Sequence, residues 1–302
     1  MIRIGILGSD NSHALAFAKI CNVCDENGNY EYDDVRVEAI YGFNDDPEHT
    51  KEVAELGKIP YIVNSPDEMI GKVDAVMVVY RDGKHHLKDI IPFLEKGYPV
   101  WIDKPIVASR EDADILKNEI IKHNALVTGG STMKYNYEVL TLKNKIDGGS
   151  LGNVTGGFMN FPGSLASEYS GLYFYGPHLC EMCLSVFGYD AKSVQATYVN
   201  DGNINVTVFY DDKQVNLNFN GKTGGKYYGL VLGDKASSIT EFDLSVIYKL
   251  GFERFVKMLK TGKMPLTVDE LLMPVYMIDA ILTSLKENKK TDIKQEVCSL
   301  GK

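Results

Sequence analysis

The sequence lacks any apolar run that approaches the roughly 20 residues needed to cross a membrane. It also lacks an excess of positive charge, because 32 lysines and arginines stand against 41 acidic residues and the formal net charge is -9. Nucleic acids and anionic membranes bind basic surfaces, so we expect neither as a partner. The first residues, MIRIGILGSDNSHA, become polar too early for a signal peptide, which predicts a cytoplasmic protein.

Cysteine is scarce as well, with five residues, and an odd number in an unexported chain indicates reduced thiols. Four of them form two C-x-x-C pairs, Cys21/Cys24 and Cys180/Cys183, a spacing that also occurs in zinc sites. Both pairs fall inside apolar helical patterns, where residues three apart share a face and a thiol packs as a small apolar group. We therefore favour buried structural cysteines over metal ligands and expect no metal site.

Two of the three glycines of a dinucleotide-binding turn are missing too. After an apolar strand, Gly8 fits the first position of G-x-G-x-x-G, but Asp10 and His13 occupy the second and third. Gly8 still permits the tight turn, and three polar residues can offer backbone N–H groups to a phosphate at the start of the next helix: Ser9, Asn11 and Ser12. We interpret the stretch as a degenerate cofactor turn, in which the Asp10 carboxylate must point away from the pyrophosphate.

The first half of the chain alternates between strand and helix patterns. The strands are expected at 2–7, 35–41, 74–80, 99–102 and 126–128, and the helices at 14–24, 48–56, 86–96 and 110–123. This alternation predicts βαβ units and an α/β fold with a doubly wound parallel sheet of the Rossmann type. Ligands bind at the carboxyl ends of such strands, so residues 8–13, 80–86 and 103–105 should share one rim.

The pattern changes after Ser131. Runs such as NVTVFY and VNLNFN alternate apolar and polar residues between Asp, Asn and Gly, which predicts a C-terminal α+β domain with an open, mainly antiparallel sheet. We expect a dinucleotide-binding domain at 1–130 and a substrate-binding and oligomerisation domain at 131–302. A helix is expected after a Tyr- and Ser-rich loop, with His178 at its start.

The stretch WIDKP, residues 101–105, resembles a motif of the Gfo/Idh/MocA oxidoreductase family, whose usual form is E-K-P. The similarity extends through HLKDIIPFLEKGYPVWIDKP at 86–105, GGSTMKY at 129–135, LGNV at 151–154 and GPHLCE at 176–181, so it covers essentially the whole chain. It implies an NAD(P)-dependent dehydrogenase that moves hydride between nicotinamide and a secondary hydroxyl of a sugar, cyclitol or related polyol. It also implies a homodimer or homotetramer assembled through the C-terminal sheet.

The resemblance assigns the proton acceptor of this reaction to Lys104. A lysine in a dry pocket beside cationic nicotinamide would have a lowered pKa, which suits a base. His178 would bind the substrate hydroxyl and share the proton transfer, and Glu181 is expected to orient its imidazole. The remaining candidates for contact with the cofactor are His13, Asn44, Arg81, His86, Asp103 and Lys104 itself.

The chain departs from the family pattern at several of these positions. Asn44 stands where an acid usually holds the adenosine ribose, Arg81 belongs to a replacement of Thr-Pro-Asn, and Phe174 replaces the first Asp of the catalytic helix motif. The neighbouring Asp45 and Asp46 disfavour a 2′-phosphate, so we expect NAD rather than NADP.

Two other functions remain open from the sequence. A non-catalytic sensor or regulatory protein on the same fold is favoured by the lost glycines and Phe174, and opposed by Lys104 and His178. A hydrolase or lyase that uses a bound cofactor transiently would share the same pocket.

Overall fold

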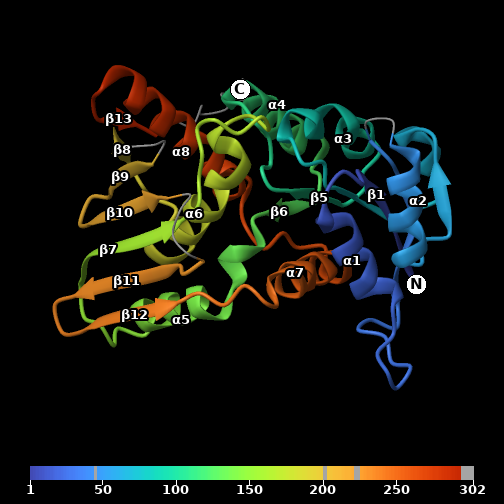
Figure 1. Cartoon of the computed structure of the whole chain (residues 1–302), viewed down its shortest axis with the longest axis horizontal. Coiled ribbons are helices and arrows are strands. Elements are labelled where there is room, and N and C mark those ends of the chain that lie inside the picture. The colour runs from blue at the N-terminus through green and yellow to red at the C-terminus, as the bar shows by residue number, and fades with distance from the viewer. Residues whose placement is uncertain (44–45, 200–202, 221–224, 294–302) are drawn as a thin grey trace.

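The computed structural model describes residues 1–43, 46–199, 203–220 and 225–293. Two sheets stand toward opposite ends of the molecule, with helices between them (Figure 1). Asn44 and Asp45 lie outside the described residues.

The first sheet is parallel throughout and has the strand order β3-β2-β1-β4-β5-β6. Its strands are β1 (Ile2–Leu7), β2 (Val35–Tyr41), β3 (Tyr61–Val63), β4 (Ala75–Val78), β5 (Val100–Asp103) and β6 (Val127–Gly130). The connecting helices are α1 (Ser12–Asn22), α2 (Pro47–Leu56), α3 (His86–Glu95) and α4 (Arg110–His123). Short 3-10 helices lie at Pro66–Met69, Gly83–His85 and Thr132–Tyr135. The predicted doubly wound sheet is confirmed.

The second sheet has seven strands in the order β12-β11-β7-β10-β9-β8-β13. These are β7 (Val154–Phe161), β8 (Ser193–Tyr198), β9 (Ile204–Phe209), β10 (Gln214–Phe219), β11 (Tyr228–Gly233), β12 (Ser237–Glu241) and β13 (Thr291–Asp292). Only the pairing of β7 with β10 is parallel among these described strands, so the sheet is mainly antiparallel, as predicted.

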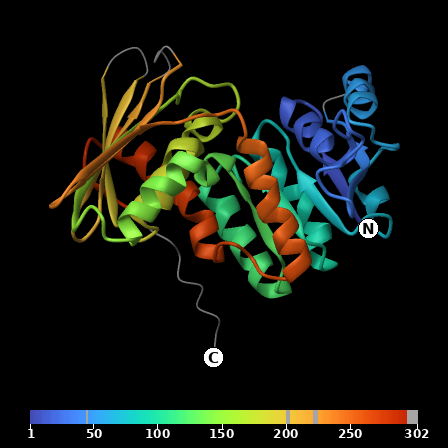
Figure 2. The same cartoon turned by 90° about the horizontal axis from the view of Figure 1, so that it is seen from below.

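Four further helices follow the first sheet in the chain: α5 (Tyr137–Asp147), α6 (Leu172–Phe187), α7 (Ile247–Thr261) and α8 (Val268–Glu287). Helices α5, α6 and α8 pack on one face of the seven-stranded sheet, which stands at one end of the molecule in Figure 2. Helix α7 instead returns to the first sheet. Its Phe252 lies 5.9 Å from the ring of Phe17 on α1, and its Phe255 lies 6.0 Å from the ring of Trp101 on β5.

The expected start of α6 is wrong. The helix begins at Leu172 rather than after His178, and Pro177 lies inside it. Packing outweighs the unfavourable proline, because Leu172, Tyr173, Gly176 and Leu179 are all buried. His178 therefore lies within the helix and is not a capping residue.

The cysteines of both C-x-x-C pairs are free thiols in the structure, and Cys21, Cys180 and Cys183 are buried. Among the described residues, no helix combines the length and apolar character that a membrane span requires.

Candidate active site

The turn between β1 and α1 requires glycine at its first position. Gly8 has a φ of 112°, and a Cβ there would lie 2.7 Å from the Tyr80 ring. Its N–H donates to the Tyr41 carbonyl at 2.9 Å, which fixes the turn to the end of β2. The chain can therefore pass close above β4 only because this residue has no side chain.

The start of α1 is capped by Asn11, whose side chain accepts the His13 N–H at 2.8 Å and donates to the Val79 carbonyl. Ser9 is buried and its hydroxyl hydrogen-bonds that of Thr50 on α2 at 2.8 Å. The first-turn amides of a helix have no intrahelical acceptor, so those of Ser12 and Ala14 can bind an anion.

Asp10 is turned toward the end of β4. Its two carboxylate oxygens lie 3.2 and 3.1 Å from the Arg81 N–H, and burial raises the pKa of this carboxyl. Arg81 in turn donates through Nη1 to the Tyr169 hydroxyl at 3.0 Å. Ser170 next to Tyr169 donates to Asp82 at 2.6 Å, so the loop before α6 is bonded to the loop after β4.

Lys104 follows β5 and is joined to Pro105 by a cis peptide bond. The side chain is 7% exposed, and its Nζ lies 4.2 Å above the centre of the Phe174 ring. Within the described residues, no hydrogen bond or ion pair involves this amine. Burial holds the pKa of Lys104 below its usual range, although Asp103 and Asp10 oppose this effect. A buried amine without a counter-ion is suited to accept a proton.

Asp103 does not pair with the lysine beside it. Its Oδ2 lies 2.5 Å from Nδ1 of His13, the residue that the sequence places at the third glycine position. The sequence analysis missed this pair, because the partners are 90 residues apart and nothing local connects them.

His178 projects from the second turn of α6, and its Nδ1 lies 2.7 Å from the Ser131 hydroxyl. Burial holds its pKa well below the usual value, and the charges of Lys104 and His13 act in the same direction. The imidazole is therefore neutral at ordinary pH. Ser131 also accepts the Met133 N–H at 3.2 Å, and its hydroxyl can donate its own hydrogen to Nδ1 of His178. In that tautomer the imidazole proton is on Nε2, which can donate to a ligand.

Glu181 does not orient His178, contrary to the expectation. Its Oε1 accepts the Ser131 N–H at 2.7 Å, and its Oε2 forms an ion pair with Lys134. Lys134 also donates to the Gly129 carbonyl at 2.6 Å. Glu181 therefore makes no hydrogen bond of its own to the imidazole. It holds the backbone of Ser131, and the Ser131 hydroxyl contacts His178. The lysine within GGSTMKY, between Met133 and Tyr135, was the available sequence signal for this buried pair.

One cavity of about 300 Å³ brings together the side chains of His13, Asp103, Lys104 and His178. It lies between the carboxyl edge of the first sheet, α6 and α7. Its polar lining is His13, Asp103, Lys104, Thr132, Tyr175, His178 and Tyr248, and its apolar lining is Met133, Phe161, Leu244 and Ile247. The site thus combines a free amine, two imidazoles and a carboxylate with four apolar side chains.

His86 is placed differently from the prediction that it contacts the cofactor. It is fully buried, its Nε2 lies 2.9 Å from the Tyr80 carbonyl, and its Nδ1 lies 3.2 Å from the Ile106 carbonyl. Neither nitrogen is left for a cofactor. His86 instead ties the end of β4 to the chain that follows the Lys104–Pro105 turn.

A second cavity, of about 510 Å³, opens beyond β2 and β3 and is lined in part by Gly42, Asp46, Thr50, Ile62 and Asn64. The start of α1 and this cavity both lie at the carboxyl edge of the parallel sheet, as does the cavity with Lys104. A dinucleotide fits this arrangement, because its two nucleoside ends can occupy the cavities while its pyrophosphate meets free amide groups.

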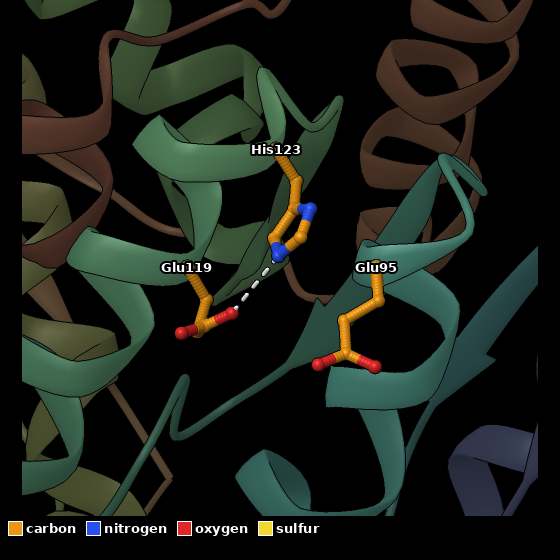
Figure 3. A group of neighbouring side chains, drawn as sticks. All are labelled: Glu95, Glu119 and His123. Atoms are coloured by element: carbon orange, nitrogen blue, oxygen red, sulfur yellow. Dashed lines mark ion pairs between the residues drawn. The ribbon is translucent and has the colours of Figure 1, made fainter.

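Another group of ionisable side chains lies at the C-terminal ends of α3 and α4 (Figure 3). Candidate ligand atoms of Glu95, Glu119 and His123 lie within 4.8 Å of one another. Glu119 is already paired with His123 at 3.2 Å and with Lys122 at 3.1 Å. Ion pairing thus accounts for the approach of Glu119 to Lys122 and His123, and basic side chains at the end of a helix also interact favourably with its dipole.

Comparison with known proteins agrees with this geometry. Residues 2–131 match the Gfo/Idh/MocA family model, described as an oxidoreductase family with an NAD-binding Rossmann fold. A search of curated proteins finds no match.

Solved structures extend the similarity to the whole chain. A myo-inositol dehydrogenase from Corynebacterium glutamicum is 15% identical, with a TM-score of 0.81 over 98% of this chain and 100% of that one. A scyllo-inositol dehydrogenase from Lactobacillus casei, solved with NAD(H) and scyllo-inositol, is 16% identical, with a TM-score of 0.80 over 97% and 99%. A myo-inositol dehydrogenase from the same organism, solved with NAD(H) and myo-inositol, is 16% identical, with a TM-score of 0.80 over 98% of this chain and 98% of that one. At these identities the likeness establishes the fold.

Proposed function

We propose that this chain, whose residues 2–131 form the NAD-binding Rossmann domain of the Gfo/Idh/MocA oxidoreductase family, is a dehydrogenase acting on a secondary hydroxyl of a sugar, cyclitol or related polyol. The observation that carries the proposal is the unpaired, buried amine of Lys104 in the same cavity as His178. The inositol complexes of structural neighbours support a polyol as the substrate class.

The residues divide the proton chemistry between them. Bound nicotinamide would supply the acceptor for the hydride that leaves the alcohol carbon. Lys104 accepts the hydroxyl proton at Nζ as the carbonyl forms, and His178 donates its Nε2–H to the substrate oxygen. The Phe174 ring covers the amine and limits its access to water, and this burial lowers the pKa of Lys104, which suits a base.

The cofactor contacts follow from the edge of the first sheet. We assign the pyrophosphate to the turn at Gly8–Ser12 and the start of α1, and the adenosine to the cavity beyond β2. Asp46 and Glu48 line that cavity, and their carboxylates disfavour a 2′-phosphate. Lys51 lines it too, but pairs with Glu55 at 4.0 Å. NAD is therefore the proposed cofactor.

A sensor without catalysis is the second candidate, and one observation favours it. The ring of Phe174 faces Lys104 where the family pattern has a carboxylate, so the amine has no acidic partner on α6 to receive its proton. Cofactor binding without turnover of any alcohol would support this alternative.

The test is the variant Lys104→Met, which keeps the length of the side chain and removes the amine. Sugars and inositols are first screened for cofactor reduction by the parent protein. Turnover of the best substrate should then fall by about 100-fold or more in the variant, the usual contribution of a positioned acid–base group. Lys88→Met, at an exposed lysine on α3, serves as the control and should retain parental turnover. Turnover of Lys104→Met within a few fold of the parent would mean that another group accepts the proton.

A further inference from the structure

The carboxylate of Asp103 has two possible cationic partners and bonds only one of them. Asp103 is 1% exposed, and it is the chain neighbour of Lys104. Its Oδ2 nevertheless lies 2.5 Å from His13 Nδ1, while the described residues contain no ion pair to the Lys104 amine. A carboxylate that could neutralise the proposed base is thus held by a histidine from another element.

His13 is itself firmly placed. Its backbone N–H is bound by the Asn11 cap, and its ring packs edge-on against Tyr248 of α7, with centroids 4.9 Å apart. Burial raises the pKa of Asp103, but His13, Lys104 and His86 outweigh it, and the net pKa lies below the usual value. An ionised carboxylate only accepts hydrogen bonds, so the proton of this pair is on Nδ1 of His13.

Loss of that donor would leave a buried carboxylate without its hydrogen bond, which is costly in a dry site. The amine of Lys104, the next residue in the chain, has no hydrogen bond or ion pair among the described residues. Rotation of the carboxylate toward it would form an ion pair, which favours the charged form of the lysine. A lysine that is charged before reaction cannot accept the hydroxyl proton.

We propose that His13 is a positioning residue for Lys104: its Nδ1–H holds the Asp103 carboxylate away from the amine and keeps the amine free of a counter-ion. The inference rests on the proposed function, in which Lys104 is the base. It explains why an imidazole occupies a position where the glycine pattern leaves no side chain, and why the acid of the Lys-Pro motif is fully buried beside the site.

Several other groups face the Lys104 amine, and the variants used in the experiment below leave all of them unchanged. The charged or ionisable ones besides Asp103 are Asp10 in the β1–α1 turn, Arg81 after β4, and His178 on α6. The rings of Phe174 and Tyr175 complete its surroundings.

The experiment compares His13→Leu, which removes the donor, with His13→Asn, whose amide places an N–H close to the position of Nδ1. Trace acetylation by acetic anhydride in cofactor-free protein, with Lys104 followed by peptide mass spectrometry, gives the pH midpoint at which this amine becomes reactive. We expect His13→Leu to raise the midpoint by about 1 pH unit or more, since an opposite charge within reach favours the ammonium form. We expect His13→Asn to keep the parental midpoint, because the donor is retained.

A double-mutant cycle with Asp103→Asn keeps the test decisive if His13→Leu folds poorly. Asp103→Asn should lower the midpoint, and the removal of His13 on that background should then have no further effect. An unchanged midpoint in His13→Leu, or an equal rise in His13→Asn, would overturn the inference. Turnover of Lys104→Met within a few fold of the parent would instead overturn the role of Lys104 in the proposed function, and the labelling measurement does not depend on turnover.

Discussion

At the scale of single residues, two buried lysines in the site have opposite electrostatic surroundings. Burial lowers the pKa of Lys134, but the Glu181 carboxylate outweighs it, and the net pKa lies above the usual value. Lys104 has no such partner, and its pKa lies below the usual value. Lys134 therefore serves structure, by holding Glu181 and through it Ser131, whereas Lys104 is available for chemistry.

The sequence singled out Lys104 and His178 as candidates, because each lies in a short motif, and the structure places both side chains in one cavity. It could not identify their supporting partners, since those depend on the tertiary fold. His13 reaches Asp103, and Ser131 reaches His178, across 90 and 47 positions of the chain. The same limit applies to His86, which was predicted to contact the cofactor but is fully buried, with its ring nitrogens at the Tyr80 and Ile106 carbonyls.

At the scale of elements, the backbone of β6 lies very close to that of β5, the strand that leads into Asp103 and Lys104. Gly129 of β6 has a φ of 144°, and a Cβ there would lie 1.8 Å from the Ile102 carbonyl oxygen, one residue before Asp103. Gly97, after α3, also has a positive φ, of 77°, but its Cβ would meet nothing within 4 Å. A substitution at Gly97 therefore tests backbone strain alone, whereas the same substitution at Gly129 tests strain together with steric overlap.

We expect Gly129→Ala to lower the free energy of unfolding by about 2–5 kcal/mol, because left-handed strain and overpacking against a strand backbone add. Gly97→Ala, the matched control, should cost only the strain of about 1–2 kcal/mol. Urea denaturation of both variants measures the difference. Equal losses would show that β5 gives way to the added methyl group, and that the contact does not hold Asp103 and Lys104 in place.

The first sheet was predictable because short apolar runs alternate with helical patterns along this part of the chain, and the helix predicted at 110–123 coincides with α4. Strand β3 has only three residues, too few to show an alternation. The start of α6 was missed because Gly176 and Pro177 are typical of a loop, while the burial of the helix around them depends on contacts that the sequence does not display.

At the scale of the whole molecule, the chain returns after the second sheet to pack a helix, α7, on the first sheet. Helix α7 covers the apolar face that Phe17 and Trp101 form, and α8 packs against both α4 and β8. We propose the domain boundary at 130/131 on the change in sheet, with α7 as a C-terminal element packed on the N-terminal sheet. The cavity that contains Lys104 and His178 is lined from both parts, so their mutual packing sets its geometry.

The seven-stranded sheet has one face without helices in the described residues. A Cβ at Gly157 would lie 2.2 Å from Phe187 of α6, so its neighbour Phe158 points to the other face. There Phe158, Leu232 and Ile239 are 38%, 41% and 69% exposed.

We propose that this face joins subunits, and we expect light scattering at micromolar concentration to give the mass of a dimer or larger assembly. Ile239→Asp should shift the distribution toward monomers, because a charge on an apolar contact weakens it. A monomeric mass for the parent chain would contradict this assembly.

The central claim is that the edge of the first sheet binds a nicotinamide dinucleotide, and direct titration of the purified chain with NADH and NADPH tests it. Nicotinamide fluorescence reports binding of each without the need for a known substrate. The account predicts saturable binding of NADH, and weaker binding of NADPH because Asp46 and Glu48 line the adenosine cavity. Tighter binding of NADPH would contradict the assignment of the cofactor, and no binding of either would contradict the account as a whole.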